Sequence, residues 1–233
     1  MQFIEKNSLN VRSAVYHLKK DGAGLEFLLF PMIHVGSKEF YDEVSRRLAA
    51  CDLILAEGVN SRKANLLTLS YRIVKKIRRM DLVTQQEGLE VSRFREKILN
   101  PDMAGRAFDE RWASLPLVLK AQLLFFIPVY VVYLFLLGTR ETLAEDIAAE
   151  DLPSSKEILF EDEKFEKLDT LLVDERDRNL IDSIGKLHDS DQRDKKIVGV
   201  VYGATHMRNV SSFLLARLNY RIVKAEWVTV FDL

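Results

Sequence analysis

The sequence predicts an α/β protein in which two repeated strand–helix–strand units form a central sheet and a helical insertion occupies the middle of the chain. The 233-residue chain is 48% hydrophobic and 30% charged, with only 10 Gly and 5 Pro, which is typical of an ordered globular protein. Its two ends carry the same order of apolar runs, and its middle carries apolar residues at helical spacing. We therefore expect a single domain over residues 1–233, with the helical insertion at about 61–165.

The chain begins with a predicted β-hairpin. Residues 13–18 favour a strand, residues 20–24 read Lys-Asp-Gly-Ala-Gly, which is typical of a turn, and residues 25–33 form a nearly continuous apolar run. A strand without polar alternation is expected to be buried on both faces, as central strands of α/β sheets are.

A helix and another strand follow the hairpin. Ser37 is suited to cap a helix that runs to about residue 50, in which Phe40, Val44 and Leu48 recur every four residues. Residues 52–56 are a short apolar run, which predicts a strand, and Glu57 comes directly after it.

The C-terminal end of the chain repeats this order. Residues 198–205 are an apolar run that ends at His206, and a predicted helix and a predicted strand that contains Glu226 follow it. His34 precedes Glu57 by 23 residues in the first copy, and His206 precedes Glu226 by 20 in the second. Because ligand sites of parallel sheets form beyond the carboxyl ends of the strands, we expect both histidines and both glutamates to lie there.

The middle of the chain is divided by charge. Residues 60–80 contain seven basic residues and no acidic one, at a spacing that predicts a basic amphipathic helix. One interpretation is that this helix binds a membrane surface or an acidic partner. The other is that it packs on the core and that its basic face is solvated. Residues 141–177 are rich in acidic residues, which either neutralise the basic helix or are solvated.

The most apolar segment, residues 121–138, contains no charged side chain. As a helix it would measure about 27 Å, close to the thickness of a bilayer core. A single crossing would place His34 and Glu57 on one side of the membrane and His206 on the other, and no second equally apolar run brings the chain back. We therefore expect a helix that is broken near Pro128 and that packs on the core, on another subunit of a homo-oligomer, or shallowly into one leaflet.

Composition narrows the remaining possibilities. The net charge of −1 gives no reason to expect nucleic-acid binding, and the single cysteine, Cys51, excludes an internal disulfide and a Cys-rich zinc site. The N-terminus has no apolar run like that of a signal peptide, so the expected location is cytoplasmic, peripheral to the membrane if residues 121–138 contact lipid. Of the remaining histidines, we expect His17 on the outer face of a strand and His188 on a solvated loop.

These motifs resemble the TraB/PrgY–TIKI–GumN superfamily and, more distantly, erythromycin esterase and ChaN-like proteins. The family pattern is a Gly-x-x-His turn, a strand-end Glu, an Arg within Glu-Arg-Asp/Asn, and a second Gly-x-x-His. This chain has His34, Glu57, Glu175-Arg176-Asp177 and Gly203-Ala204-Thr205-His206 in that order. The resemblance covers about residues 12–60 and 165–233. One departure is Pro31, which stands where the family has Gly and removes a backbone N–H.

The resemblance implies a hydrolase, but the family is divided. The TIKI branch is similar to metal-dependent proteases that use manganese or cobalt, TraB and PrgY relatives are linked to the shutdown of peptide pheromone signalling, and ChaN relatives bind heme. It implies that His34, His206 and Glu57 hold a divalent metal (Mn, Co or Zn) and that Glu57 and Arg176 are catalytic, on a peptide or a small amide or ester.

The residue types support two chemical interpretations. Two imidazoles and a carboxylate are a normal ligand set for Zn, Mn, Co or Fe, and a bound metal would make a nucleophile of water. Without a metal, Glu57 is a candidate general base, with His34 or His206 as the acid, and Arg176 would bind a carboxylate or stabilise an oxyanion. The alternative to a hydrolase is a non-catalytic, membrane-associated binding or regulatory protein that keeps the fold. Without a chemical role, Arg176 would be a surface ion-pair residue in an acidic helix.

Overall fold

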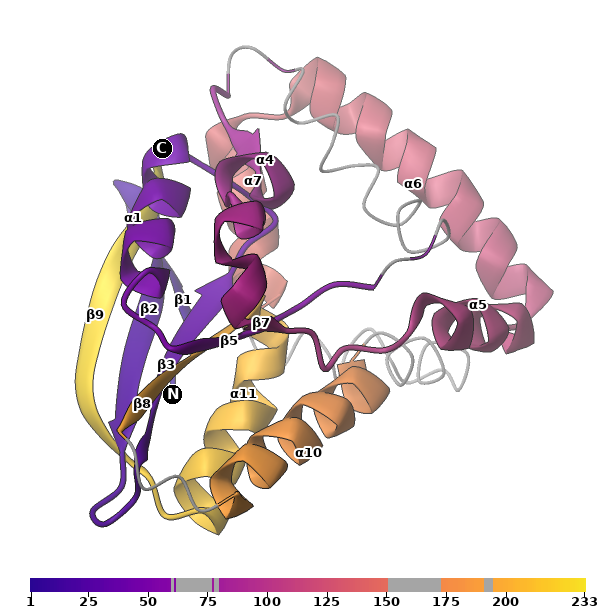
Figure 1. Cartoon of the computed structure of the whole chain (residues 1–233). Coiled ribbons are helices and arrows are strands. Elements are labelled where there is room, and N and C mark those ends of the chain that lie inside the picture. Colours follow the sequence, from indigo (N-terminus) through magenta and orange to yellow (C-terminus); the bar gives the residue numbers. More distant parts are fainter. Residues whose placement is uncertain (60, 62–76, 78–79, 151–172, 191–194) are drawn as a thin grey trace.

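A computed structural model describes residues 1–59, 61, 77, 80–150, 173–190 and 195–233 of the chain. Its centre is a seven-stranded mixed sheet with helices on both faces (Figure 1). The sheet consists of β1 (Ile4–Lys6), β2 (Asn10–Lys19), β3 (Leu25–Met32), β5 (Leu53–Ala56), β7 (Ile98–Leu99), β8 (Lys196–Gly203) and β9 (Arg221–Asp232). These strands confirm the predicted α/β class.

The sheet has an antiparallel and a parallel part. The predicted hairpin is confirmed, because β2 and β3 pair antiparallel across the turn at residues 20–24. On its other side β2 pairs antiparallel with β9, and β1 lies beside residues 11–13 of β2. Strands β3, β8, β5 and β7 are adjacent in that order and all parallel. Their carboxyl ends therefore meet at one edge of the sheet.

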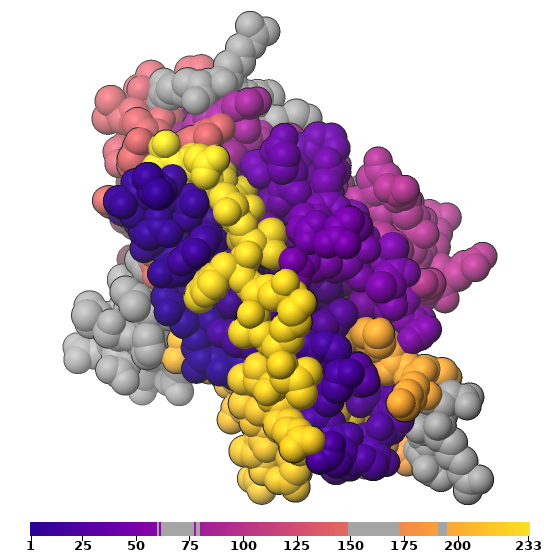
Figure 2. All heavy atoms as spheres, turned by 90° about the vertical axis from the view of Figure 1, so that its left-hand side faces the viewer, coloured from indigo at the N-terminus to yellow at the C-terminus, as the bar shows by residue number. Residues whose placement is uncertain are grey.

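The two predicted repeat units interleave in this sheet. The first unit is β3, α1 (Lys38–Leu48) and β5, and the second is β8, α11 (Ala204–Ser212) and β9. Strand β8 of the second unit lies between β3 and β5 of the first and pairs with both. Strand β9 crosses to the opposite end of the sheet, where Figure 2 shows it as a continuous band between the N-terminal strands and α1. Strands β3 and β5 are thus each covered along one edge by a strand of the other unit.

Alternating side chains of the strands build two cores. Phe30 and Met32 of β3 pack on the face that α1 covers, where Phe40 and Leu48 are buried as the helical spacing predicts. Phe27 and Leu29 point to the other face, covered by α11 and α10 (Glu175–Asp189). Ser37 caps α1 by accepting a hydrogen bond from the Phe40 N–H. The result is a three-layer arrangement of helices, sheet and helices.

The insertion contains the predicted helices and, in addition, short strands. It contains β6 (Val83–Thr84), which pairs with β4 (Val35–Gly36), α4 (Gln85–Gly88), the 3₁₀ segment η1 (Val91–Lys97) and then β7, which extends the central sheet. After β7 the described residues of the insertion are mainly helical and form α5 (Gly105–Ser114), α6 (Leu117–Leu137) and α7 (Arg140–Glu150). Most of the predicted basic helix at 60–80 and of the acidic block at 141–177 lies outside the described residues.

Helix α6 differs from the expectation in two respects. It is one continuous helix with Pro128 inside it, so the predicted break is wrong. A proline removes one backbone hydrogen bond, and here the many others along 21 residues keep the helix intact. Nor is the helix packed into the core: only 11% of its most apolar 18-residue window is buried, although it is long and apolar enough to cross a membrane.

Gly88 of α4 lies directly against Tyr41 of α1. A Cβ atom at this position would lie 2.2 Å from Cδ2 of Tyr41, whose ring is buried and whose hydroxyl donates to the Ile33 carbonyl at 2.8 Å. We expect Gly88→Ala to lower the free energy of unfolding by about 1–3 kcal/mol, because the overlap must be relieved by shifting α4 or the ring. Urea unfolding measures this. The control is Gly22→Ser, in an open turn with no atom near a new Cβ, where only the positive φ of 80° is unfavourable.

Candidate active site

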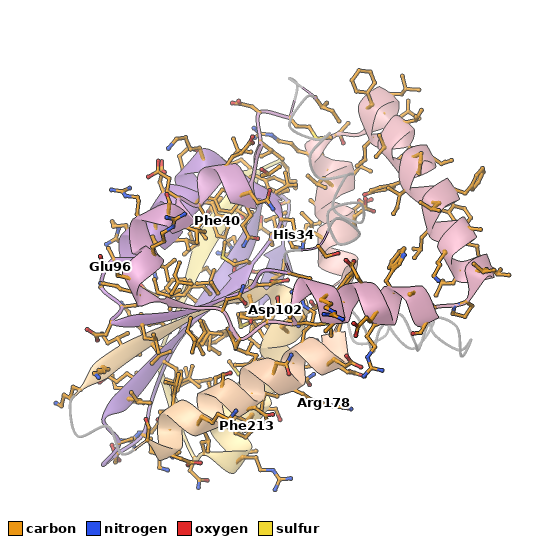
Figure 3. The ribbon with its side chains drawn as sticks, turned by 45° about the vertical axis from the view of Figure 1, so that its right-hand side comes forward. His34, Phe40, Glu96, Asp102, Arg178 and Phe213 are labelled. Atoms are coloured by element: carbon orange, nitrogen blue, oxygen red, sulfur yellow. The ribbon has the colours of Figure 1, made fainter. Side chains whose placement is uncertain are left out.

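Four parallel strands deliver polar residues to one edge of the sheet. His34 follows β3, Glu57 follows β5, Asp102 follows β7, and Gly203 ends β8 just before His206. Residues separated by most of the chain thus converge, as expected for the carboxyl ends of adjacent parallel strands. Figure 3 shows His34 and Asp102 on the side of the sheet that faces α5 and α6.

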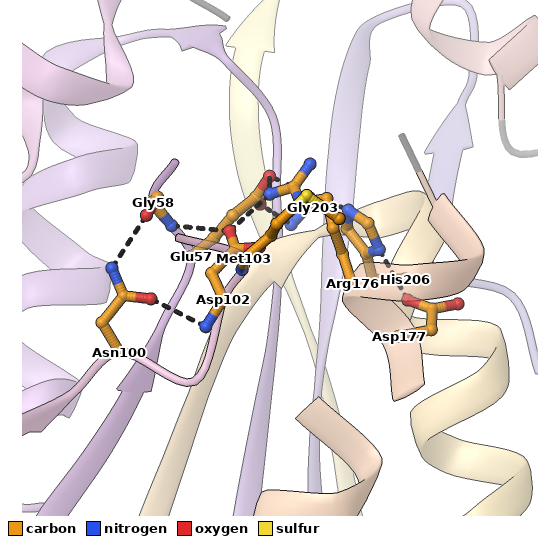
Figure 4. Close-up of polar contacts among 9 residues, drawn as sticks. All are labelled: Glu57, Gly58, Asn100, Asp102, Met103, Arg176, Asp177, Gly203 and His206. Atoms are coloured by element: carbon orange, nitrogen blue, oxygen red, sulfur yellow. Dashed lines mark hydrogen bonds and ion pairs between the residues drawn. The ribbon is translucent and has the colours of Figure 1, made fainter. Parts of the chain in front are cut away.

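The Arg176 guanidinium holds the site together. From the first turn of α10, its Nη2 lies 2.5 Å from Oε1 of Glu57 and 2.7 Å from Oδ2 of Asp102, and its Nε donates to Oδ1 of Asp102 at 2.8 Å (Figure 4). The Arg176 side chain is 11% exposed and that of Glu57 12%. Arg176 is therefore a buried bridge between two carboxylates, and not a surface ion-pair residue.

Asp102 was not predicted from the sequence. Its carboxylate is fully buried and also accepts hydrogen bonds from the backbone N–H groups of Gly58 (2.9 Å) and Met103 (2.7 Å). Asn100 fixes this loop, because its amide donates to the Gly58 carbonyl at 2.8 Å and its oxygen accepts from the Asp102 N–H at 2.9 Å. The available signal was an Asn-Pro-Asp turn after the apolar pair Ile98-Leu99, but a two-residue strand carries no periodicity.

His206 is fixed by a buried carboxylate. In the first turn of α11, its Nδ1 lies 2.6 Å from Oδ1 of Asp177, whose other oxygen accepts a hydrogen bond from the Asn209 amide. Because a carboxylate can only accept, Nδ1 carries the shared proton, so in the neutral imidazole the lone pair is on Nε2. That Nε2 faces the site, 3.8 Å from Oε1 of Glu57. The Tyr202 ring packs edge-on against the imidazole, with ring centroids 5.7 Å apart.

His34 completes the site from β3. Its backbone carbonyl accepts a hydrogen bond from the Gln85 N–H at 2.9 Å, which ties the His34 loop to α4. Burial lowers the pKa of His34 below its ordinary value, and the charges of Arg176 and His206 lower it further, whereas Glu57 opposes them. His34 is therefore within electrostatic reach of the other three predicted residues, and its neutral form is favoured.

The Glu57 carboxylate is held in its ionised form. Burial by itself would raise its pKa, but Arg176, His206, His34 and the Gly203 N–H, 2.6 Å from Oε2, together lower it to about 2. Gly203 is the N-cap of α11, so Glu57 also lies at the positive end of that helix. Burial and the carboxylates of Asp102 and Glu57 raise the pKa of the Tyr202 hydroxyl, which bonds to none of the described residues.

The predicted metal ligands do not form a metal-binding arrangement in this structure. Among the described residues, no group of three His, Cys, Asp or Glu side chains is placed to hold a metal ion. One oxygen of Glu57 pairs with Arg176 and the other with the Gly203 N–H, so the carboxylate is engaged and a guanidinium charge stands where a cation would bind. The metal role of His34, His206 and Glu57 stays a prediction.

Two sequence assignments need correction. Glu226, expected at a strand end beside the others, lies within β9 and pairs with Arg47 at 3.2 Å and Lys224 at 2.9 Å. The two units therefore share the order strand–helix–strand along the chain, but the second unit does not bring its glutamate to the site. His188, expected on a loop, lies in the last turn of α10, where Nδ1 is 3.2 Å from the Tyr220 hydroxyl.

Fold and site together define an α/β protein with a buried, charged site at the carboxyl ends of four parallel strands. No protein-family model, curated protein or solved structure matches this chain. The TraB/TIKI resemblance consequently rests on the motif residues themselves, of which Glu57, Arg176 and His206 lie in direct or near contact.

The site predicts how stability depends on pH. His34 and Glu57 both have pKa values below their ordinary 6.5 and 4.5, so the unfolded chain binds protons that the folded protein does not. We expect full stability above about pH 6.5, a first loss as His34 titrates in the unfolded chain, and a further loss of up to about 3 kcal/mol between pH 4.5 and 2 from Glu57. Urea midpoints across this range measure it. In Glu57→Gln the loss of stability between pH 4.5 and 2 should be smaller than in the wild type. If this loss is unchanged, it comes from other carboxyl groups.

Proposed function

We propose that this protein is a hydrolase of the TraB/TIKI type, which cleaves an amide or ester bond in a peptide or small molecule. The observation that carries the proposal is the buried row Asp177–His206–Glu57 at the carboxyl ends of the parallel strands. A carboxylate on Nδ1 and an open Nε2 form the arrangement by which a neutral imidazole acts as a general base.

The proposed reaction begins with a water molecule between His206 and Glu57. The 3.8 Å between Nε2 and Oε1 lets one water contact both atoms. Nε2 takes a proton from the water as its oxygen attacks the substrate carbonyl carbon, and the imidazolium that forms is stabilised by Asp177 and Glu57. When the tetrahedral intermediate collapses, the imidazolium returns the proton to the leaving amine or alcohol.

Arg176 supplies the positive charge of the site. Burial by itself would lower the pKa of Arg176, but Asp102 and Glu57 raise it above its ordinary value, so the guanidinium stays charged. A fixed positive charge beside the reacting carbonyl favours the oxyanion that develops in the transition state. Asp102 holds this charge in place without contacting the reacting atoms, which makes it a positioning residue.

The substrate would extend from the site into a neighbouring cavity. An open cavity of about 640 Å³ lies between α5 and α10, and its lining includes Met103, Arg111, Ser114, Glu175, Arg178 and Asn179. Met103 and Glu175 directly adjoin Asp102 and Arg176 in the chain, so the cavity borders the charged site. Its mixture of apolar, basic and acidic side chains suits a short peptide better than a purely apolar ester.

A second candidate is the non-catalytic, membrane-associated binding protein. The exposed apolar helix α6 favours membrane association, and the engagement of Arg176 by two carboxylates suits a structural role for that residue. This candidate keeps the fold and the ion pairs but requires no turnover.

A hydrolysis assay separates the two candidates. Purified protein would be incubated with a panel of short peptides, p-nitrophenyl esters and anilides, with EDTA and with added Mn²⁺, Co²⁺ or Zn²⁺. Turnover in the wild type that Glu57→Gln abolishes, at unchanged circular dichroism, supports the hydrolase. Turnover only with added metal would restore the metal-dependent interpretation, and folded protein without turnover on any substrate would favour the binding protein.

A further inference from the structure

Helix α6 presents a wide apolar surface to the outside of the molecule. It has 21 residues, about 31 Å at 1.5 Å per residue. At about 100° per residue, its exposed apolar side chains cover about 220° of the circumference. They are Leu117, Val118, Leu124, Phe125, Phe126, Val129, Val132, Tyr133, Phe135, Leu136 and Leu137. The narrower remaining stripe contains Leu123, Ile127, Tyr130, Val131 and the buried Leu134, and it faces the protein.

Both ends of α6 are tied to the same body. Before it, Arg111 of α5 pairs with Glu175 of α10 at 3.0 Å. After it, Arg140 donates to the backbone carbonyls of Met80 (2.6 Å) and Asp232 (2.9 Å), and the first turns of α7 enter the core through Leu143 and Ala144. Figure 1 shows α6 running along the side of the molecule between these two attachments.

We propose that α6 lies parallel to a membrane surface with its wide apolar arc buried in the acyl chains of one leaflet. A contiguous exposed apolar surface along a 21-residue helix is of the kind that marks an interaction site for another protein or for a membrane. Lipid fits an arc of about 220°, because acyl chains adapt to any apolar curvature. The inference does not depend on the proposed hydrolysis.

A membrane-spanning orientation conflicts with the site. Glu57 and Arg176 are joined at 2.5 Å, although α6 lies between them in the sequence. A single crossing would place them on opposite sides of the bilayer, and the sequence contains no second run as apolar as residues 121–138. Lying within one leaflet is the membrane arrangement that keeps the site intact.

A second copy of the chain is a less suitable partner. The seam between two packed helices is a stripe of about 100° or slightly more, which would leave about half of the apolar arc in water. The arc contains one polar side chain, Gln122, whereas interfaces between soluble subunits end in a polar rim. The acyl region of a leaflet requires no such rim.

Vesicle flotation tests the proposal with three proteins. The test variant is Phe125→Ser/Val129→Ser/Leu136→Ser, at the centre of the arc, where the three side chains are 64%, 49% and 62% exposed. The matched control is Leu9→Ser/Val91→Ser/Val223→Ser, three exposed apolar residues outside α6. We expect wild type and control to float with phosphatidylcholine vesicles and the test variant to bind about 100-fold more weakly. Circular dichroism and urea unfolding check that all three remain folded.

Measuring the depth of labels in the bilayer distinguishes an α6 that lies parallel to the membrane from one that spans it. A fluorescent label is attached to a cysteine that replaces Phe125 in one variant and Leu136 in another. The native Cys51 is buried and does not compete for the label. The two labelled positions are about 17 Å apart along the helix. Quenchers at shallow and deep acyl positions should report the same depth for both labels. Different depths would indicate a spanning helix and overturn the proposal. If the wild type does not float but forms a dimer through α6, the proposal is also wrong. The same holds if the wild type floats only with anionic vesicles and the test variant floats equally well.

Discussion

Replacing Arg176 by alanine should lower the free energy of unfolding by about 3–5 kcal/mol at pH 7. The guanidinium is the shared partner of Glu57 and of the fully buried Asp102, so its removal leaves two carboxylates facing each other without a counter-charge. The pKa of Glu57 should rise in the variant, because Arg176 is the charge that lowers it most. The variant should therefore lose less further stability than the wild type when the pH falls from 4.5 to 2. Urea unfolding at several pH values measures both effects.

Two further variants make this prediction specific. Arg178→Ala removes an exposed arginine from the same helix and should change stability by at most about 0.5 kcal/mol. Adding Glu57→Gln to Arg176→Ala should restore part of the lost stability, because one unpaired buried charge is then neutralised. If Arg176→Ala is no more harmful than Arg178→Ala, the buried bridge does not exist in solution.

The largest effect on activity should come from His206. We expect His206→Gln to reduce kcat by about 10² to 10⁴, the contribution typical of a general base, while KM changes little. Asp177→Asn should also reduce kcat strongly, because an amide can donate to Nδ1 and so favour the tautomer with its proton on Nε2. Hydrolysis kinetics measure the loss, and nitrogen NMR of the histidine ring identifies the tautomer.

His188→Gln is the matched control for this experiment. His188 also lies on a helix and within bonding distance of a buried residue, Tyr220, but it is remote in the fold from the carboxyl ends of the parallel strands. Its replacement should leave kcat unchanged. A wild-type tautomer with its proton on Nε2, or equal losses in the two histidine variants, would contradict the proposed base.

Much of the site could be predicted because each residue follows a readable local pattern. His34 and Glu57 directly follow apolar runs that became β3 and β5, and His206 follows Gly203 at the end of β8. A strand-end position needs only the strand to be recognised, and strands of four to eight apolar residues are recognisable. Arg176 is indicated by its motif and not by any periodicity.

Asp102 and the orientation of His206 were decided by contacts that no local pattern encodes. Asp102 enters the site because the two-residue strand β7 pairs with β5, and a strand that short has no alternation to detect. Asp177 was visible within its motif, but its role depends on α10 packing beside α11 so that its carboxylate reaches Nδ1 of His206. Both partners reach the site through pairing across long sequence separations.

The sequence by itself determined the α/β class, the hairpin, the helix after Ser37 and the chemical identity of the central residues, because these follow from hydrophobic periodicity and local turn chemistry. Only the tertiary structure decided that β8 lies between β3 and β5, that β9 leaves Glu226 far from the site, and that α6 runs unbroken through Pro128 with its apolar side outward. The physical reason is that strand order and helix exposure depend on which distant surfaces bury one another. Strand order and helix exposure therefore depend on the free energy of the whole packed chain and cannot be predicted from any single segment.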